Sequence, residues 1–162
     1  MKKIHRYWLV SVLMLMLSPT LFAAKSGWEP PPAQAEDSAY ADGLAAFERE
    51  DWENVIVHMN KAIERQPWHD DAYNLAGFAY RKLGDYDRSL EYYHKALELN
   101  PHNRGALEYL GEAYLELGKP VQADNTLTRL AEECKRVIAA LVECHEWQDL
   151  KEAVDAYSKA AH

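Results

Sequence analysis

Between residues 70 and 100 the apolar positions recur every three or four residues, the spacing of helices that bury one face. A first helix is predicted with Tyr73, Gly77 and Tyr80 on its buried face. Gly84 then suits the left-handed residue that ends a helix. The apolar stripe of a second helix consists of Tyr86, Leu90, Tyr93 and Leu97. The pattern therefore predicts two helices joined by a short turn.

The same pattern repeats along the chain with a period of 34 residues. Glycines keep this step in two series, which are Gly43, Gly77 and Gly111, and Gly84 and Gly118. Further pairs with this separation are Ala62 and Ala96, Glu64 and Glu98, and Pro67 and Pro101. Gly77 and Ala96 are expected to be small because two helices cross there. Such a period is typical of helical pairs that stack and share a core.

The residues at these positions resemble the consensus of the tetratricopeptide repeat (TPR) family. The middle unit, 70–103, matches through Tyr73, Gly77, Tyr80, Gly84, Tyr86, Tyr93, Ala96 and Pro101. The first unit, 36–69, matches through Gly43, Trp52, Met59, Ala62 and Pro67. The third unit, 104–136, keeps Leu107, Leu110, Gly111, Tyr114, Gly118, Ala123 and Leu127, but departs at Pro120 and Lys135. The resemblance implies an all-α fold, an α-solenoid of about three helix-turn-helix units.

Residues 137–162 are expected to cap this solenoid. One amphipathic helix is predicted there, with the stripe Trp147, Leu150, Ala153, Val154 and Tyr157. A repeat array needs such a helix, with a polar outer face, at its end. Together with Cys134 and Cys144 the region resembles small exported bacterial TPR proteins, in which a Cys pair precedes a final capping helix.

Cys134 and Cys144 are the only cysteines in the sequence. In an exported protein they favour a single structural disulfide. One unbroken helix through both residues would separate their Cα atoms by about 15 Å, whereas a disulfide requires about 5.5 Å. A bridge therefore requires a chain reversal, and no glycine or proline between the two cysteines indicates one.

Residues 1–24 are predicted to be a secretory signal peptide. A basic start is followed by an apolar run from Tyr7 to Leu17 and by Ala23 and Ala24. An uncleaved membrane anchor is the alternative, for which this stretch with its Pro19 is barely long enough. Residues 25–35 contain three consecutive prolines and are predicted to be an extended linker. We therefore expect an exported, periplasmic protein without membrane insertion after cleavage.

Charge and motif content argue against several classes of function. The net charge is −8, and it becomes −11 without residues 1–24, which hold three basic residues and no acidic one. Such a chain repels nucleic acid. No nucleophile, phosphate-binding or paired-carboxylate motif is present, so neither catalysis nor a cofactor is expected. A metal-handling or thiol-redox protein using Cys134, Cys144 and His145 is a weaker alternative, because no zinc-ligand spacing or CxxC motif supports it.

In TPR proteins the first helix of each unit lines a concave groove that usually receives a peptide or a helix of another protein. Carried over by position, the resemblance assigns to this groove Tyr40, Leu44, Phe47, Asn74, Phe78, Arg81, Lys82, Tyr109, Glu112 and Glu116. Some TPR proteins clamp a terminal carboxylate with Lys and Asn at positions occupied here by Tyr40, Leu44, Leu75, Gly105 and Tyr109, so that clamp is absent. In the alternative interpretation Tyr40, Leu44 and Phe78 pack between neighbouring repeats.

The sequence thus predicts a non-catalytic adaptor, scaffold or assembly factor that binds a protein or peptide. The bound segment is expected to be extended or helical and to carry aromatic or aliphatic anchors. A scaffold that associates with further copies of itself is the main alternative.

Overall fold

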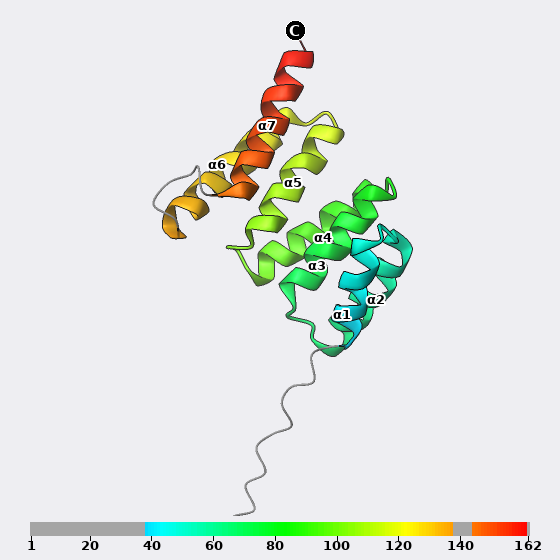
Figure 1. Ribbon diagram of the computed structural model, residues 1–162. Coiled ribbons are helices and arrows are strands. Elements are labelled where there is room, and N and C mark those ends of the chain that lie inside the picture. Colours follow the sequence, from blue (N-terminus) through cyan, green and yellow to red (C-terminus); the bar gives the residue numbers. More distant parts are fainter. Residues whose placement is uncertain (1–37, 138–143, 162) are drawn as a thin grey trace, which may run out of the picture. The chain divides into compact units, whose positions relative to one another are not determined.

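The computed structural model describes residues 38–137 and 144–161, which form seven α-helices and no strand (Figure 1). The helices are α1 (Ser38–Glu48), α2 (Trp52–Arg65), α3 (Asp70–Lys82), α4 (Tyr86–Leu99), α5 (Arg104–Glu116), α6 (Pro120–Val137) and α7 (His145–Ala160). The predicted signal peptide and linker, residues 1–24 and 25–35, lie outside these ranges. None of the helices in the described ranges is both long and apolar enough to cross a membrane. The predicted all-α fold is confirmed.

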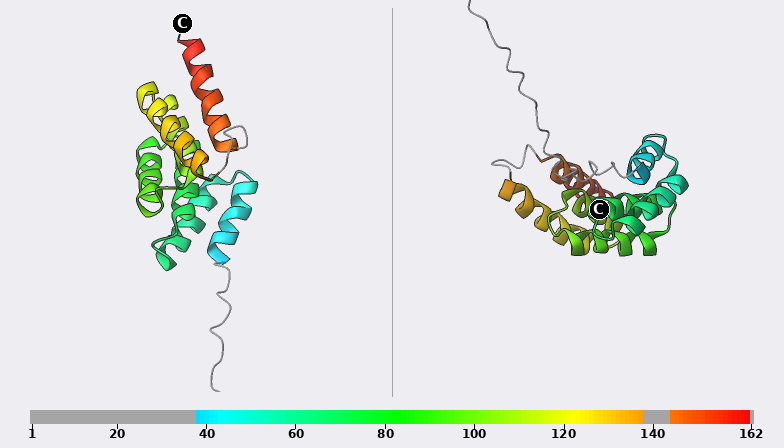
Figure 2. Two further views of the ribbon diagram at one scale, coloured as in Figure 1. Left: turned by 90° about the vertical axis from the view of Figure 1, so that its left-hand side faces the viewer. Right: turned by 90° about the horizontal axis from the view of Figure 1, so that it is seen from below.

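The first six helices form three consecutive pairs, each joined by a short turn. Helix α1 packs on α2, α3 on α4 and α5 on α6, while α2 with α3 and α4 with α5 connect one pair to the next. Figure 2 shows the pairs following one another in chain order. This arrangement is a helical solenoid, as the repeat period predicts.

The turn inside each pair contains one residue with a positive φ angle. These residues are Glu50 at 56°, Gly84 at 79° and Gly118 at 67°, and they keep the 34-residue step. The prediction that Gly84 takes the left-handed conformation is confirmed. Glycine adopts this conformation without steric cost, whereas a residue with a Cβ atom is strained there.

Side-chain caps begin three of the helices. The carboxylates of Asp51 and Asp85 and the amide oxygen of Asn103 each accept a hydrogen bond from the backbone N–H three residues further on, at 3.4, 3.1 and 2.9 Å. These caps fix the starts of α2, α4 and α5. Asn103 also donates to the carboxylates of Asp70 and Asp71, at 2.8 and 2.9 Å, and so ties the start of α5 to the start of α3.

Within the first two pairs the helices cross at a glycine. A Cβ atom on Gly77 would lie 2.9 Å from Cδ1 of Tyr93, and one on Gly43 would lie 2.6 Å from Cε of Met59. Both partner side chains are fully buried, so they have little room to move. The predicted packing role of Gly77 is confirmed.

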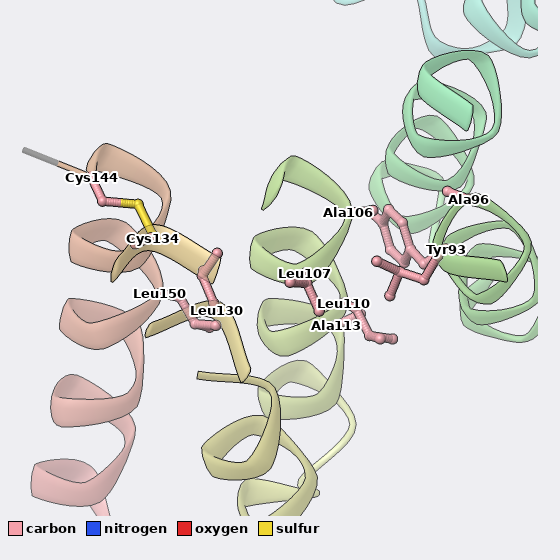
Figure 3. Packing of buried hydrophobic residues seen from close by; sticks show 11 residues of the cluster. Tyr93, Ala96, Ala106, Leu107, Leu110, Ala113, Leu130, Cys134, Cys144 and Leu150 are labelled. Atoms are coloured by element: carbon pink, nitrogen blue, oxygen red, sulfur yellow. A yellow bond between two sulfur atoms is a disulfide. The ribbon is translucent and has the colours of Figure 1, made fainter. Parts of the chain in front are cut away.

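Buried side chains form two clusters, one in α1–α3 and one that extends from α4 to α7. The second cluster contains Leu130, which is fully buried and stands 34 residues after Ala96. Figure 3 shows Leu130 of α6 next to Leu150 of α7. The third pair thus has a large side chain where the earlier pairs have alanine, and α7 packs against it.

A disulfide joins the end of α6 to the start of α7. The Cα atoms of Cys134 and Cys144 lie 6.0 Å apart, and both residues are fully buried (Figure 3). Helix α6 ends at Val137 and Cys144 directly precedes α7, so the two cysteines do not share one unbroken helix. The separation of about 15 Å that a single helix would impose therefore does not arise. Helix α7 packs on both α5 and α6.

Candidate functional site

Four aromatic side chains from α1, α2, α3 and α5 meet around Phe78. The ring centroid of Phe78 lies 5.0 Å from that of Phe47, 5.5 Å from that of Trp52 and 4.7 Å from that of Tyr109. All four residues are only half-buried. These residues, here called the aromatic cluster, join the three pairs and also present apolar surface to solvent.

Arg81, at the end of α3, is buried beside this cluster and is paired twice. Its residue is only 7% exposed, and its guanidinium contacts the carboxylates of Glu112 at 2.7 Å and Glu116 at 3.1 Å. The guanidinium also lies 5.0 Å from the ring centroid of Phe78 and 5.7 Å from that of Tyr109. The paired carboxylates compensate the desolvation of this cation, so Arg81 is charged and held in place.

Burial alone would lower the pKa of the Arg81 guanidinium, but the charges of Tyr93, Glu112 and Glu116 leave that pKa above its usual value. Lys82, the next residue, is exposed, and its ammonium lies 5.8 Å from the ring of Trp52 and 5.7 Å from the ring of Phe78. The two neighbouring cations therefore have different environments, one neutralised by carboxylates and one lying over aromatic rings.

Glu108 is an acidic residue of α5 that the sequence analysis did not select. It is 9% exposed, and its burial is the main cause that raises the pKa of its carboxyl to about 8. The charges of Glu112, Asp149 and Glu146 raise this pKa further, while Arg81 lowers it. At neutral pH the Glu108 carboxyl is therefore mostly protonated.

An open groove of about 580 Å³ lies between α3, α5 and α7. Its lining residues are Arg81, Lys82, Glu112, Leu115, Glu116, Ala153, Ala156, Tyr157 and Ala160. Helix α7 thus contributes one wall, which the carry-over from the repeats did not include. The signal was present in the sequence, because Ala153, Ala156 and Ala160 recur at helical spacing on α7.

The predicted groove residues fall into three groups. Phe47, Phe78 and Tyr109 belong to the aromatic cluster, and Arg81, Lys82, Glu112 and Glu116 line the adjoining groove. Leu44 is exposed on α1. Tyr40 is half-buried with its ring centroid 4.4 Å from that of His69, and burial followed by the charges of Asp71 and Asp70 raises its pKa to about 12.

Asn74 is only 6% exposed, which places it in the interior more than in the groove. Its Nδ2 atom lies 3.0 Å from the place of a Cβ on Gly105 of α5, and its Oδ1 atom has no hydrogen-bond partner among the described residues. Asn74 thus packs between α3 and α5.

The predicted alternatives of metal or thiol chemistry depend on Cys134, Cys144 and His145. Both sulfur atoms belong to the disulfide, so neither supplies a thiolate ligand or nucleophile. In residues 38–137 and 144–161, no group of three or more His, Cys, Asp or Glu side chains is arranged to hold a metal ion.

Consecutive helical pairs with a shared core and a groove beside their first helices define the chain as a helical-repeat protein. Two models of the tetratricopeptide repeat match it, over residues 70–103 and 106–134. The chain belongs to the tetratricopeptide repeat family. The comparison with curated proteins found no match.

Solved TPR structures share this fold. The TPR2B domain of yeast Sti1, in its pHsp70 complex, has a TM-score of 0.68 and 21% identity over 74% of this chain and 95% of that domain. The first TPR of Spaghetti (RPAP3), bound to the HSP90 peptide SRMEEVD, has a TM-score of 0.64 and 17% identity over 76% and 90%. PcrH, in complex with the chaperone binding region of PopD, has a TM-score of 0.67 and 13% identity over 78% and 92%.

Proposed function

We propose that this protein is a non-catalytic TPR adaptor or assembly factor that binds a peptide or protein segment. The observation that carries the proposal is the open groove between α3, α5 and α7 with the half-exposed aromatic cluster at its side. Aromatic side chains beside a groove are typical anchoring points for a partner segment. The Sti1, Spaghetti and PcrH structures, which are named as complexes with such partners, support the proposal.

The proposed site consists of Tyr40, Leu44, Phe47, Asn74, Phe78, Arg81, Lys82, Tyr109 and Glu112, extended by the α7 wall. Its central part is the aromatic cluster together with Arg81 and Lys82. Tyr40 and Leu44 extend the surface along α1, and Asn74 supports α5 from below. The repeat boundaries 36–69, 70–103 and 104–136, and the cap 137–162, stay predictions.

We further propose that the protein works in an exported, periplasmic compartment. The basic and apolar pattern of residues 1–24 supports export. The disulfide supports it independently, because cytosolic thiols are kept reduced. N-terminal sequencing of the chain recovered from the periplasm of an expressing bacterium tests this part, and an intact Met1 there contradicts cleavage.

Self-association is the second candidate function. The observation that favours it is the exposed apolar surface of the first repeat, where Trp68 is 70% exposed, Val57 46% and Leu44 40%. Light scattering over a range of protein concentrations separates the two candidates, since an adaptor for another protein stays monomeric in isolation.

The groove itself is tested by filling it. Ala156 is exposed on α7 and lines the groove, so Ala156→Arg places a long side chain there without changing the core. Ser158 is exposed on the same helix and does not line the groove, so Ser158→Arg is the matched control. A partner captured from the exported fraction by the wild type and Ser158→Arg should be lost with Ala156→Arg. Equal capture by all three proteins would overturn the proposed groove.

A further inference from the structure

Helix α5 presents a row of carboxylates to the groove. Glu108, Glu112 and Glu116 follow at intervals of four residues and therefore share one face of the helix. The orientation of this face is known, because Glu112 and Glu116 line the groove and contact Arg81. These three residues are here called the acidic stripe.

The acidic stripe has more negative charge than its neighbours compensate. Arg81 pairs with Glu112 and Glu116, and the ammonium of Lys82 lies over the rings of Trp52 and Phe78. No hydrogen bond or ion pair reaches the buried Glu108 from the described residues, which is the most expensive situation for a carboxylate.

Helix α7 brings further acids towards Glu108. Asp149 and Glu146 both act on its carboxyl, and only Glu146 has a cationic partner, Arg104 at 3.3 Å. The groove thus lacks a positive charge opposite Glu108.

We propose that the segment bound in the groove supplies this charge, as a lysine or arginine side chain that contacts Glu108 and Glu112 while its apolar neighbours lie on the aromatic cluster. This inference rests on the proposed function. An acidic segment is disfavoured in the same place, because its carboxylates would have to displace Glu112 and Glu116 from Arg81. The chemistry is therefore opposite to that of a carboxylate clamp.

Such a contact links binding to protons. The pKa of Glu108 is about 8 in the unoccupied groove, and a cation next to the carboxyl lowers it. Binding of a basic segment then releases a proton from Glu108, so its affinity rises as the pH increases from about 6 to about 8.5. The groups that face Glu108 are Glu112 and Arg104 on α5, Arg81 on α3, and Glu146 and Asp149 on α7.

A random twelve-residue peptide library displayed on phage, selected against the full chain, tests the inference. We expect enriched peptides in which a lysine or arginine lies next to aromatic or aliphatic residues. Enrichment of acidic or uncharged peptides that Ala156→Arg no longer binds would overturn the inference and leave peptide binding in the groove standing. If no peptide is enriched, both the inference and the proposed groove function fail.

Charge removal at one atom pair completes the test. Glu108→Gln keeps the shape of the side chain, and it should weaken the best arginine-containing peptide by about tenfold in fluorescence anisotropy and abolish the pH dependence. Glu132→Gln is the control, because Glu132 is exposed on α6 and does not line the groove. Equal affinity of Glu108→Gln and wild type, with unchanged circular dichroism, would overturn the proposed contact.

Discussion

Leu150 of α7 packs against Gly111 of α5, at the position where the two earlier pairs use a residue of their own second helix. A Cβ atom on Gly111 would lie 2.5 Å from Cδ2 and 3.1 Å from Cγ of Leu150. The equivalent Gly43 and Gly77 face residues of α2 and α4 instead. Helix α7 therefore completes the core of the third pair and is part of the folded solenoid.

The first prediction concerns this contact. Gly111→Ala should lower the free energy of unfolding by about 1–3 kcal/mol, because Leu150 is fully buried and cannot move aside. An exposed helical glycine behaves oppositely, since alanine there stabilises by roughly 0.5–1 kcal/mol. Urea denaturation measures the change. In a Leu150→Ala background the same substitution should become neutral or stabilising, and a loss of similar size in both backgrounds would refute the contact.

The disulfide should stabilise the attachment of α7. Replacing Cys134 and Cys144 with serine removes a short covalent loop and should cost about 2–3 kcal/mol. Amide hydrogen exchange should increase more in α7 than in α1–α4, because the loop ends directly at α7. The oxidised wild type should show no titratable thiol, and two reactive thiols would contradict the bridge.

Glu50 offers a test of the turn geometry. It is the only non-glycine residue with positive φ in the described ranges, and Gly84 and Gly118 stand at the equivalent positions. Glu50→Gly should therefore stabilise the protein by up to about 1 kcal/mol in thermal or urea denaturation. Glu53→Gly, inside α2, should instead destabilise by about 1 kcal/mol. A loss of stability in both variants would mean that Glu50 is not strained.

The buried carboxyl of Glu108 predicts a pH dependence of stability. Its pKa is about 8 in the folded chain, raised by burial and then by Glu112, Asp149 and Glu146, against an ordinary value of 4.5. The folded state thus holds a proton that the unfolded state has lost, so this contribution to stability declines as the pH rises from about 5 to about 8. Glu108→Gln should remove the decline and be more stable than the wild type at pH 8, by about 1–3 kcal/mol.

Urea denaturation of both proteins at several pH values between about 5 and 9 measures this difference. The exposed Glu132→Gln should follow the wild type throughout. Parallel curves for the wild type and Glu108→Gln would show that Glu108 titrates normally in the folded protein.

The fold could be predicted from the sequence where each repeat meets the same physical demand. Every turn needs a left-handed residue and every crossing needs a small one, so Gly84 and Gly77 recur with the repeat period. The docking of α7 follows no such repetition. It depends on Leu130, which replaces the small residue of the earlier repeats, and on Leu150, and these contacts are visible only in three dimensions.

The candidate site was predicted in part, because carry-over by position works only inside the repeats. It selected Phe78, Arg81 and Tyr109, which the structure brings together. It supplied no position on α7 and therefore missed Ala156. Glu108 was also missed, since its burial arises from the packing of several helices and not from its own spacing.

The wall that α7 adds has a consequence for the order in which the groove is completed during synthesis. A growing chain that has reached residue 137 contains α3 and α5 but not α7, so it presents a groove with two walls. The third wall requires translation beyond residue 160 and oxidation of Cys134 with Cys144 to secure it. The complete groove is therefore a property of the oxidised chain, and a nascent or reduced one offers a more open surface.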